Sequence, residues 1–405
     1  MNELLDRLKA LGLNIDIAAN LKKRDKNISS LQAITNGKWI DFHEGRLFMV
    51  EENLPYGYSH GSVVLKYLID LQSILFFHDK SIPSDIKINE IAFIDVETSG
   101  LSSGSGTLVF LVGICYLDDT GIRLVQVFLD DPINERNYLE CLDDLLSKFQ
   151  LLISYNGKTF DIPIMKTRYI MNRMHHQFDT KAHLDLLILA RKIWKYSLES
   201  KSLSVIENEI LNFHRSESEV PGWLVPQIYY DYLQNGDSNL LTGVFYHNKM
   251  DILSLSALFQ FIVSLVSNEK NILDNEGLDI FSLACLLIPY LDNNKLINYF
   301  EKCIEKGLPD EKQIQIFNKI GSFYKINHLW EKAIAIWENN AKFGDCLSCV
   351  ELAKYYEHRK KNYIKALYWA NQAETILEKN GLSSNNLKIG LRKNRLLEKV
   401  SKSDE

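Results

Sequence analysis

Long hydrophobic runs are missing from this sequence of 405 residues. No apolar stretch approaches the ~20 residues that a helix needs to span a bilayer. The longest candidate, Leu253–Val266, is interrupted by serine, glutamine and small residues. The chain start carries acids where a secretory signal has a basic and then an apolar stretch. We therefore expect a cytoplasmic protein with no membrane contact.

Cysteine is scarce, with six residues in the whole chain, as expected in a reducing compartment. Two of them form an isolated Cys346-Leu347-Ser348-Cys349 pattern. A zinc site needs four ligands, and a thioredoxin-type motif needs a preceding strand. Because this segment has a helical pattern, we expect both cysteines to pack inside a helix; a redox or metal role is the alternative.

An excess of positive charge is also absent, since the formal net charge is -6. This excludes a basic protein that coats nucleic acid. Residues 358–402 are an exception, with 11 lysines and arginines against 3 acids. This stretch either guides nucleic acid electrostatically or forms the solvated cap of a helical array.

The 46% hydrophobic content supplies sizeable cores and excludes disorder, and the length fits two or three domains. Residues 86–266 have an α/β pattern. Short apolar runs predict strands at 91–96, 108–116, 122–128 and 151–155. Helical patterns and one extended segment cover 138–149, 164–171, 183–186 and 243–266. Antiparallel strands followed by strand–helix alternation predict a mixed sheet flanked by helices.

The flanking regions differ from this domain. Residues 1–85 form an N-terminal extension of uncertain structure, with an amphipathic start and a part that docks on the following domain. His43 and His60 lie in this extension, where turn or capping roles compete with metal binding. Residues 270–400 have no strand pattern. Aromatic and alanine positions recur there at offsets of about 32–33 residues, which favours tetratricopeptide-like helical repeats over an irregular bundle.

Acidic residues follow three predicted elements of the α/β domain. Asp95 and Glu97 end the first strand on one face, because side chains alternate along a strand. Asp161 opens a helix after the fourth strand. His247 and Asp251 are four residues apart and therefore neighbours on the last helix. Each alone is a common cap or turn residue, but four converging carboxylates form an all-oxygen site for hard divalent cations.

These positions resemble the motifs of the DEDD-type 3′–5′ exonucleases of the ribonuclease H-like superfamily. Residues 93–101, Phe-Ile-Asp-Val-Glu-Thr-Ser-Gly-Leu, match the first motif. The second is matched by Asn156, Phe160 and Asp161, and the third by His247 and Asp251. Further features, at 183–187, 202–207, 221–229 and 247–251, are similar to the YprB-like branch. The resemblance covers roughly residues 88–262.

The resemblance implies a ribonuclease H-like fold and a two-metal nuclease. Asp95 would bridge two Mg²⁺ or Mn²⁺ ions, Glu97 and Asp251 would complete one shell, and Asp161 would contribute to the other. His247 would be the general base. The substrate, a nucleic acid with a 3′ end, would contact the residues of the first two motifs: Thr98, Ser99, Gly100, Leu101, Asn156, Lys158 and Phe160.

One spacing departs from the family pattern. Histidine-type enzymes usually have one more residue between the base and the final aspartate than separates His247 from Asp251. Tyr246 has that longer separation and is the competing candidate. One helical position rotates a side chain by ~100°, so the geometry of the base stays open at this stage.

Weaker candidates surround this set. Lys158, Arg168 and Arg173 either hold backbone phosphates or lie on a solvated helix face. Asp185 is either a fifth acid near the metals or a strand-end cap. Trp194, Tyr196 and Trp223 are expected in the core, with base stacking as the alternative. The glycine-rich segment 100–106 lacks the Gly-Lys-Ser/Thr ending of a P-loop, so it predicts a loop touching substrate and not a nucleotide site.

The leading interpretation is a metal-dependent 3′–5′ exonuclease whose helical repeats bind a protein partner or the substrate. A non-catalytic scaffold that holds nucleic acid or protein is one alternative, which the presence of all four acids argues against. A structure-selective endonuclease is the other. A circular or 3′-blocked substrate separates the three, because only an endonuclease cuts it and a binding protein shifts it without cleavage.

Overall fold

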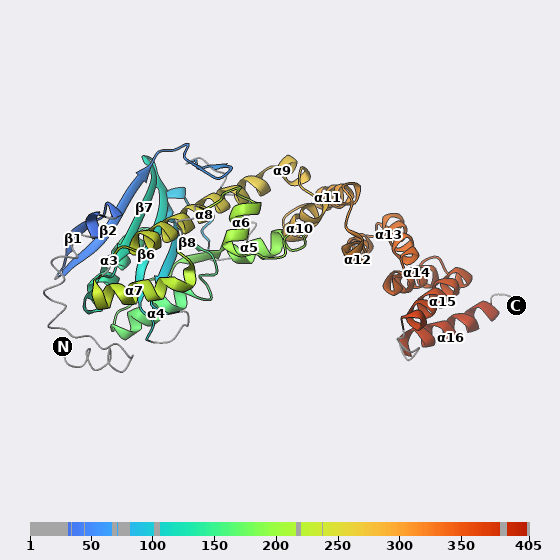
Figure 1. The fold of residues 1–405 in the computed structure, drawn as a ribbon. Helices are drawn as coiled ribbons and strands as arrows, with labels where there is room; N and C mark the ends of the chain where they lie inside the picture. The colour runs from blue at the N-terminus through green and yellow to red at the C-terminus, as the bar shows by residue number, and fades with distance from the viewer. Residues whose placement is uncertain are drawn as a thin grey trace. The chain divides into compact units, whose positions relative to one another are not determined.

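The computed structural model describes residues 31–33, 35–43, 45–66, 71, 82–100, 106–215, 220–236, 238–380 and 387–402. The chain divides into two compact units, Met1–Asp274 and Asn275–Glu405, which have separate buried hydrophobic clusters (Figure 1). The amphipathic start of the sequence lies outside the described residues.

The first unit is built on a mixed sheet of seven strands with the order β1-β2-β7-β6-β5-β8-β9. These strands are β1 (Lys38–Phe42), β2 (Gly45–Leu54), β5 (Ile91–Thr98), β6 (Val109–Asp118), β7 (Gly121–Phe128), β8 (Leu151–Ser154) and β9 (Ala182–Asp185). Neighbours from β1 to β5 are antiparallel, whereas β5, β8 and β9 are parallel. The predicted α/β class with a mixed sheet is confirmed, and β6 and β7 meet in a hairpin at Asp118 and Gly121 as expected.

The parallel part of the sheet determines where the polar residues gather. Because β5, β8 and β9 run in the same direction, their carboxyl ends lie at one edge of the sheet. The segments that follow these strands therefore start side by side. Asp95 and Glu97 at the end of β5, Asp161 after β8 and Asp185 at the end of β9 all belong to this edge.

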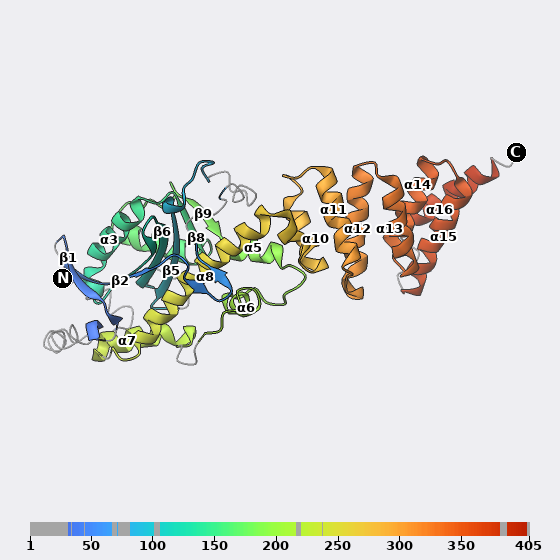
Figure 2. The ribbon, with the colours of Figure 1, turned by 90° about the horizontal axis from the view of Figure 1, so that it is seen from above.

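Helices cover both faces of the sheet. They are α3 (Glu135–Ser147), α4 (Asp161–Met171), α5 (Leu186–Ile193), α6 (Leu203–Glu209), α7 (Val225–Asn235), α8 (Leu241–Ser267) and α9 (Glu269–Leu273). Figure 2 shows α3 and α8 on opposite sides of the strands. Alternate residues of β5 face α8: Phe93 packs on Phe259 with ring centroids 5.5 Å apart, and Asp95 contacts Asn248.

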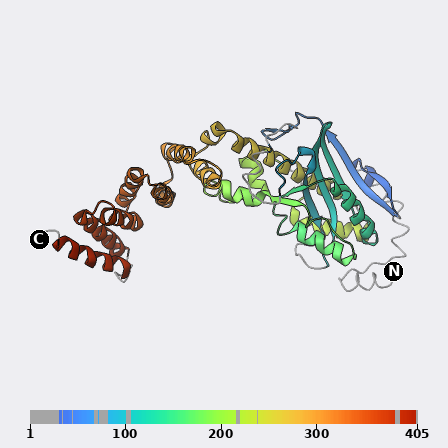
Figure 3. The same ribbon diagram turned by 180° about the vertical axis from the view of Figure 1, so that it is seen from behind.

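The segment before residue 86 adds to the sheet. Strands β1 and β2 form a hairpin whose second strand pairs with β7, so this segment supplies one edge of the sheet (Figure 3). Strands β3 (Ser59–His60) and β4 (Val63–Val64) form a small separate hairpin against α8. His43 lies in the turn between β1 and β2 with a φ of 46°.

Helix α8 is the longest and most apolar element. By length and composition it is apolar enough to cross a membrane, but 78% of its most apolar window is buried inside the protein. It contacts β3, β4, β5, β6 and β7. Its hydrophobic character is explained by this burial, which is typical of a central core helix.

The second unit consists of helices packed side by side in chain order (Figure 2). They are α10 (Gly277–Leu287), α11 (Asn293–Glu305), α12 (Asp310–Ile326), α13 (Trp330–Lys342), α14 (Cys346–His358), α15 (Tyr363–Lys379) and α16 (Leu387–Ser401). The prediction of an all-helical second part is confirmed. Cys346 and Cys349 lie on α14 as free thiols, and Cys349 packs against Ala373 and Ile389.

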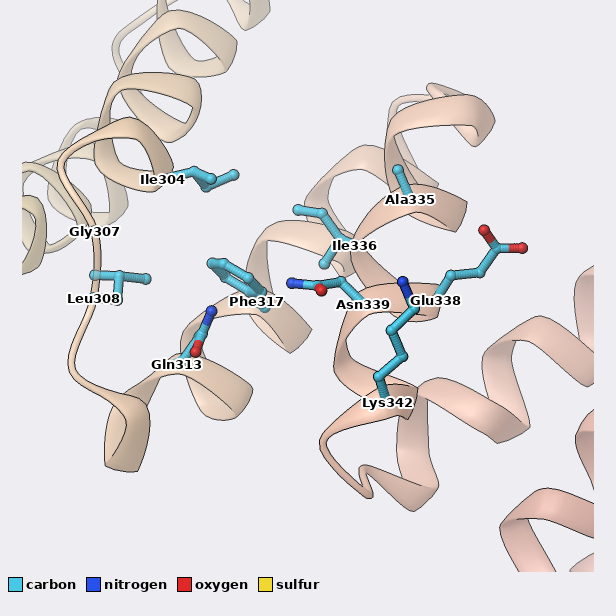
Figure 4. Close-up of a pocket in the computed structure, with 10 residues that line it drawn as sticks. All are labelled: Ile304, Gly307, Leu308, Gln313, Phe317, Ala335, Ile336, Glu338, Asn339 and Lys342. Carbon is cyan, nitrogen blue, oxygen red and sulfur yellow. The ribbon is translucent and has the colours of Figure 1, made fainter.

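A pocket of about 560 Å³ lies within this helical unit between α11, α12 and α13 (Figure 4). Ile304, Leu308 and Phe317 supply apolar walls, and Glu338 and Lys342 supply charged groups. None of the predicted site residues lines it.

Arg168 is buried, so both sequence interpretations of this residue are wrong. It neither faces solvent nor is placed to hold phosphate, because its guanidinium makes two 2.6 Å hydrogen bonds to the carboxylate of Glu135. The side chains are 8% and 9% exposed. The pair joins α4 to α3, a long-range contact that the local sequence does not indicate. Arg173 is exposed directly after α4.

We predict that Arg168→Met lowers the free energy of unfolding by about 3–5 kcal/mol, because it leaves the Glu135 carboxylate buried without a counter-ion. Arg136→Met is the matched control, since Arg136 pairs with Glu140 on the exposed face of α3. The control should lose less than about 1 kcal/mol. Urea unfolding measures both, and equal losses would contradict a structural role for the buried pair.

Candidate active site

The four predicted carboxylates come together at the carboxyl edge of the sheet. Asp95 and Glu97 lie on β5, Asp161 is the first residue of α4, and Asp251 lies near the middle of α8. Each of the first three is close enough to feel the negative charge of Asp251. Residues separated by more than 150 positions thus share one electrostatic environment.

The pKa values of these carboxyls show how unfavourable their ionised forms are. Burial, followed by the charges of Asp251, Glu97 and Asp161, raises the pKa of Asp95 well above its ordinary value. Burial and the charges of Asp251 and Asp161 do the same for the pKa of Glu97. Burial and the charges of Asp185 and Asp251 raise the pKa of Asp161 to about 7. Clustered carboxyls repel one another in this way when no cation offsets their charge.

Asn248 fixes the position of Asp95 and is fully buried. Its amide nitrogen donates to a carboxylate oxygen of Asp95 at 2.9 Å, and its amide oxygen accepts from Gln126 at 2.8 Å. Gly113 on β6 makes room for it, because a Cβ there would lie 2.2 Å from the Asn248 amide oxygen. In the sequence, Asn248 is part of the 247–251 feature of the YprB-like branch, but its contact with Asp95 was not predicted.

The loop after β8 is held by Asp185. Its carboxylate accepts from the backbone nitrogens of Asn156 at 2.8 Å and Lys158 at 3.2 Å, and it also caps α5 at Leu187. Asn156 has a left-handed φ of 64°. A Cβ on Gly157 would lie 2.8 Å from a carboxylate oxygen of Asp161, so the loop backbone closely approaches that acid. Asp185 is thus a strand-end cap, and it also lies close enough to Asp161 for its charge to raise the pKa of that acid.

His247 lies beside Asp251 on α8. Its Nε2 is 3.5 Å from the Asp251 carboxylate, and its Nδ1 is 3.3 Å from a guanidinium nitrogen of Arg215. Tyr246 lies elsewhere, close enough to Tyr58 to raise the pKa of that phenol after burial and Glu52. The two candidate bases therefore have different surroundings, and His247 is the one among the acids.

Arg215 and Glu207 belong to this site, although their roles were not foreseen from the sequence. Arg215 follows α6 in the chain and donates to the carboxylates of both Glu207 and Asp251. Glu207 had been noted only as a feature of the YprB-like branch. No sequence pattern around Arg215 indicates its partners, so its contacts with Glu207 and Asp251 could be identified only from the structure.

The predicted substrate-contacting residues differ in exposure. Phe160 is 45% exposed beside Asp161, and Lys158 is also exposed. Thr98 donates to the carbonyl of Gly100 at 2.8 Å, and the Ser99 hydroxyl accepts from the backbone nitrogen of Leu108 at 2.9 Å. These two hydroxyls thus shape the start of the glycine-rich loop. Leu101 lies outside the described residues.

The aromatic candidates separate into two groups. Trp194 and Tyr196 are 2% and 9% exposed, in agreement with core packing. Trp223 is 71% exposed, so core packing is wrong for this residue. It lies in the 3-10 turn Gly222–Leu224 before α7, whose buried side chains are those of Val225, Ile228, Tyr229 and Tyr232.

The basic C-terminal stretch is largely used within the helical unit. Arg392, Arg395 and Lys399 of α16 pair with Glu357, which is 2% exposed. Burial alone would raise the pKa of Glu357, but hydrogen bonds from Arg395 and Lys399 lower it to about 2. Of the two interpretations of this basic stretch, the ion pairs favour a cap of the helical array over a surface that guides nucleic acid.

The carboxylates fit divalent cations chemically, because Asp95, Glu97, Asp161 and Asp251 offer only oxygen donors and have too little positive charge around them. Their present arrangement is not a finished coordination shell. In the part of the chain that the structure describes, no three histidine, cysteine, aspartate or glutamate side chains are placed to hold one ion. Asp251 is instead engaged by Arg215.

We predict that the metal-free protein loses stability as the pH rises from about 5 to about 7. Asp161 has a pKa of about 7 in the folded chain and an ordinary value of 3.8, so between these values the folded state binds the proton more tightly. This contribution is complete below the ordinary pKa and is lost as the pH rises through 7, at roughly 1 kcal/mol per pH unit.

Unfolding by guanidinium chloride in EDTA at a series of pH values tests this dependence. Asp161→Asn should flatten the slope, whereas Asp118→Asn at the β6–β7 hairpin turn should leave it unchanged. Parallel slopes for wild type and Asp161→Asn would contradict the raised pKa.

Comparison with known proteins agrees with the ribonuclease H-like fold class. Residues 92–263 match the RNase_H superfamily. The chain is 32% identical over 292 residues to the uncharacterized protein YprB of Bacillus subtilis (strain 168), which covers 70% of this chain and 69% of that protein. A solved family B DNA polymerase from the archaeon Pyrobaculum calidifontis aligns with a TM-score of 0.35 and 13% identity, over 54% of this chain and 29% of the polymerase. By its similarity to YprB across more than two thirds of both chains, the protein belongs to the YprB family and contains an RNase H-superfamily domain.

Proposed function

We propose that this protein is a metal-dependent nuclease of the DEDD type that hydrolyses nucleic acid from the 3′ end. The observation that carries the proposal is the cluster of four carboxylates, Asp95, Glu97, Asp161 and Asp251, with raised pKa values on the first three. A folded chain tolerates such repulsion poorly unless the acids serve a ligand. The RNase H-superfamily match of the same residues supports a nuclease.

The four carboxylates would hold two divalent cations, Mg²⁺ or Mn²⁺. When bound, such ions supply activation of the attacking water and compensation of the charge that develops on the phosphate. The chain's own residues do the rest. Asn248 holds the Asp95 carboxylate in place, and the Asn156–Lys158 loop, anchored on Asp185, presents Asp161.

His247 would accept the proton of the attacking water. It lies beside Asp251, and histidine is the side chain that most often acts as a general base in enzymes. The exposed ring of Phe160, one residue before Asp161, is suited to contact the terminal base or sugar. Lys158, exposed on the same loop, is suited to a backbone phosphate.

The second unit would be a tetratricopeptide-like array that binds a protein partner or part of the substrate. Its helices pack as successive neighbours, and the recurring alanines Ala333 and Ala366 are fully buried. Trp337 is buried against Gly321, where an added Cβ would lie 2.6 Å from the indole nitrogen. Small residues opposite aromatic ones are what closely stacked helix pairs require. The pocket in Figure 4 offers mixed apolar and charged groups for such contacts.

We predict that Asp95→Asn lowers the cleavage rate roughly 10²–10³-fold, the equivalent of a few kcal/mol of transition-state stabilisation. The assay uses end-labelled single- and double-stranded DNA and RNA with Mg²⁺ or Mn²⁺. Asp118→Asn, at the opposite end of the sheet, is the control and should retain full activity.

The choice of substrate separates the alternatives. A linear strand should be shortened from its 3′ end, whereas a circular or 3′-blocked strand should stay intact. Cutting of the circle would indicate an endonuclease, and binding without any cleavage would indicate a scaffold. Full metal-dependent activity of Asp95→Asn would overturn the assignment of the site.

A second prediction distinguishes the two candidate bases. His247→Ala should reduce kcat by about 10²–10⁴-fold, because general-base catalysis contributes on that order. Tyr246→Phe should keep the wild-type kcat, since Tyr246 lies near Tyr58. The opposite result would assign the base to Tyr246.

A further inference from the structure

Arg215 occupies a position among the acids that a structural ion pair alone does not explain. Its side chain is 14% exposed, and its guanidinium forms two hydrogen bonds to Glu207, at 2.6 and 2.7 Å. The same guanidinium donates to the Asp251 carboxylate and lies 3.3 Å from Nδ1 of His247. One permanently charged side chain therefore contacts a predicted metal ligand, the predicted base and a second carboxylate at once.

Glu207 accepts hydrogen bonds from Arg215 and is itself buried and hydrogen-bonded. Its side chain is 1% exposed and accepts a hydrogen bond from the hydroxyl of Ser254 on α8. The Ser254 oxygen also lies 2.8 Å from Nε2 of His60, whose ring packs on Phe213 with centroids 3.9 Å apart. The β3–β4 hairpin, α6 and α8 thus share one buried polar chain that ends at Arg215.

This arrangement has a consequence for Asp251. A carboxylate oxygen that accepts from a guanidinium shares its lone pairs and its charge with that donor, so its affinity for a second cation falls. Glu207 provides Arg215 with a counter-charge that does not depend on Asp251. The guanidinium can therefore release Asp251 without becoming an unpaired buried charge.

We propose that Arg215 is a built-in counter-cation that competes with the divalent ion for Asp251, and that Glu207 retains Arg215 when Asp251 is released. The inference rests on the proposed metal site and goes beyond it, because it assigns a positioning residue that controls loading of that site. It explains why Asp251 is turned to Arg215 and why, among the described residues, the acids do not form a finished shell.

Calorimetric titration of the full chain with Mn²⁺, without nucleic acid, tests the proposal. Arg215→Gln should bind Mn²⁺ about tenfold more tightly than wild type, a change of ordinary size for removal of one competing interaction. Glu207→Gln should bind it more weakly, because Arg215 then loses the carboxylate that accepts two of its hydrogen bonds and depends more on Asp251. A loss of fold would weaken binding in both variants, so opposite signs identify competition.

Two further variants make the test specific. Arg123→Gln removes another arginine–carboxylate pair, with Asp118 at the far hairpin turn, and should leave Mn²⁺ affinity unchanged. Arg215→Lys keeps the charge but loses the fork that spans two carboxylates, so it should bind Mn²⁺ more tightly than wild type. This variant also carries the test if Arg215→Gln fails to fold.

The outcomes separate the inference from the proposed function. Mn²⁺ binding by wild type with equal or weaker binding by both Arg215 variants would overturn the competition and leave the metal site intact. Folded wild-type and Arg215-variant proteins that all fail to bind Mn²⁺ would overturn the metal site and, with it, the role of Arg215.

Discussion

Repulsion between carboxylates at one edge of the sheet is the constraint on which the rest of this site depends. Asp95, Glu97 and Asp161 are buried close to Asp251, and burial with mutual charge raises the pKa of each of these three. Hydrogen bonds from fixed side chains reduce the repulsion between these carboxylates, but their negative charge is not fully neutralised. Asn248 donates to Asp95, and Arg215 donates to Asp251. Asp95 and Asp251 are thus held in place while the cluster stays short of positive charge, as the proposed cation site requires.

Two other buried acids show how the same chain treats carboxylates that have only a structural role. Glu135 is matched by both nitrogens of the Arg168 fork, and Glu357 is surrounded by Arg392, Arg395 and Lys399. The pKa of Glu357 is lowered by these partners, whereas the pKa values at the sheet edge are raised. The acids at the sheet edge therefore have less compensating positive charge around them than Glu357 has.

Features that depend on neighbouring residues could be predicted from the sequence. Contacts between residues far apart in the chain could not. Short apolar runs predicted β5, β6, β7 and β8, because a buried strand must be apolar on both faces. The order of the acidic motifs predicted that the acids would meet. Burial of Arg168 and the contact of Arg215 with Asp251 depend on partners more than 30 positions away, so no pattern near these residues indicates them. Pairing of β2 with β7 was missed for the same reason.

Helix α8 contributes both to the candidate site and to the hydrophobic core. His247, Asn248 and Asp251 lie within little more than one turn, so one helix must bring the proposed base, a positioning amide and an acid to the end of β5. It reaches that place only by crossing the middle of the sheet, where its other faces contact β5, β6 and the β3–β4 hairpin. Such a helix must be apolar on nearly all sides except at the site. Two of its buried polar side chains contact the acids discussed above: Asn248 donates to Asp95, and Ser254 donates to the Glu207 that holds Arg215.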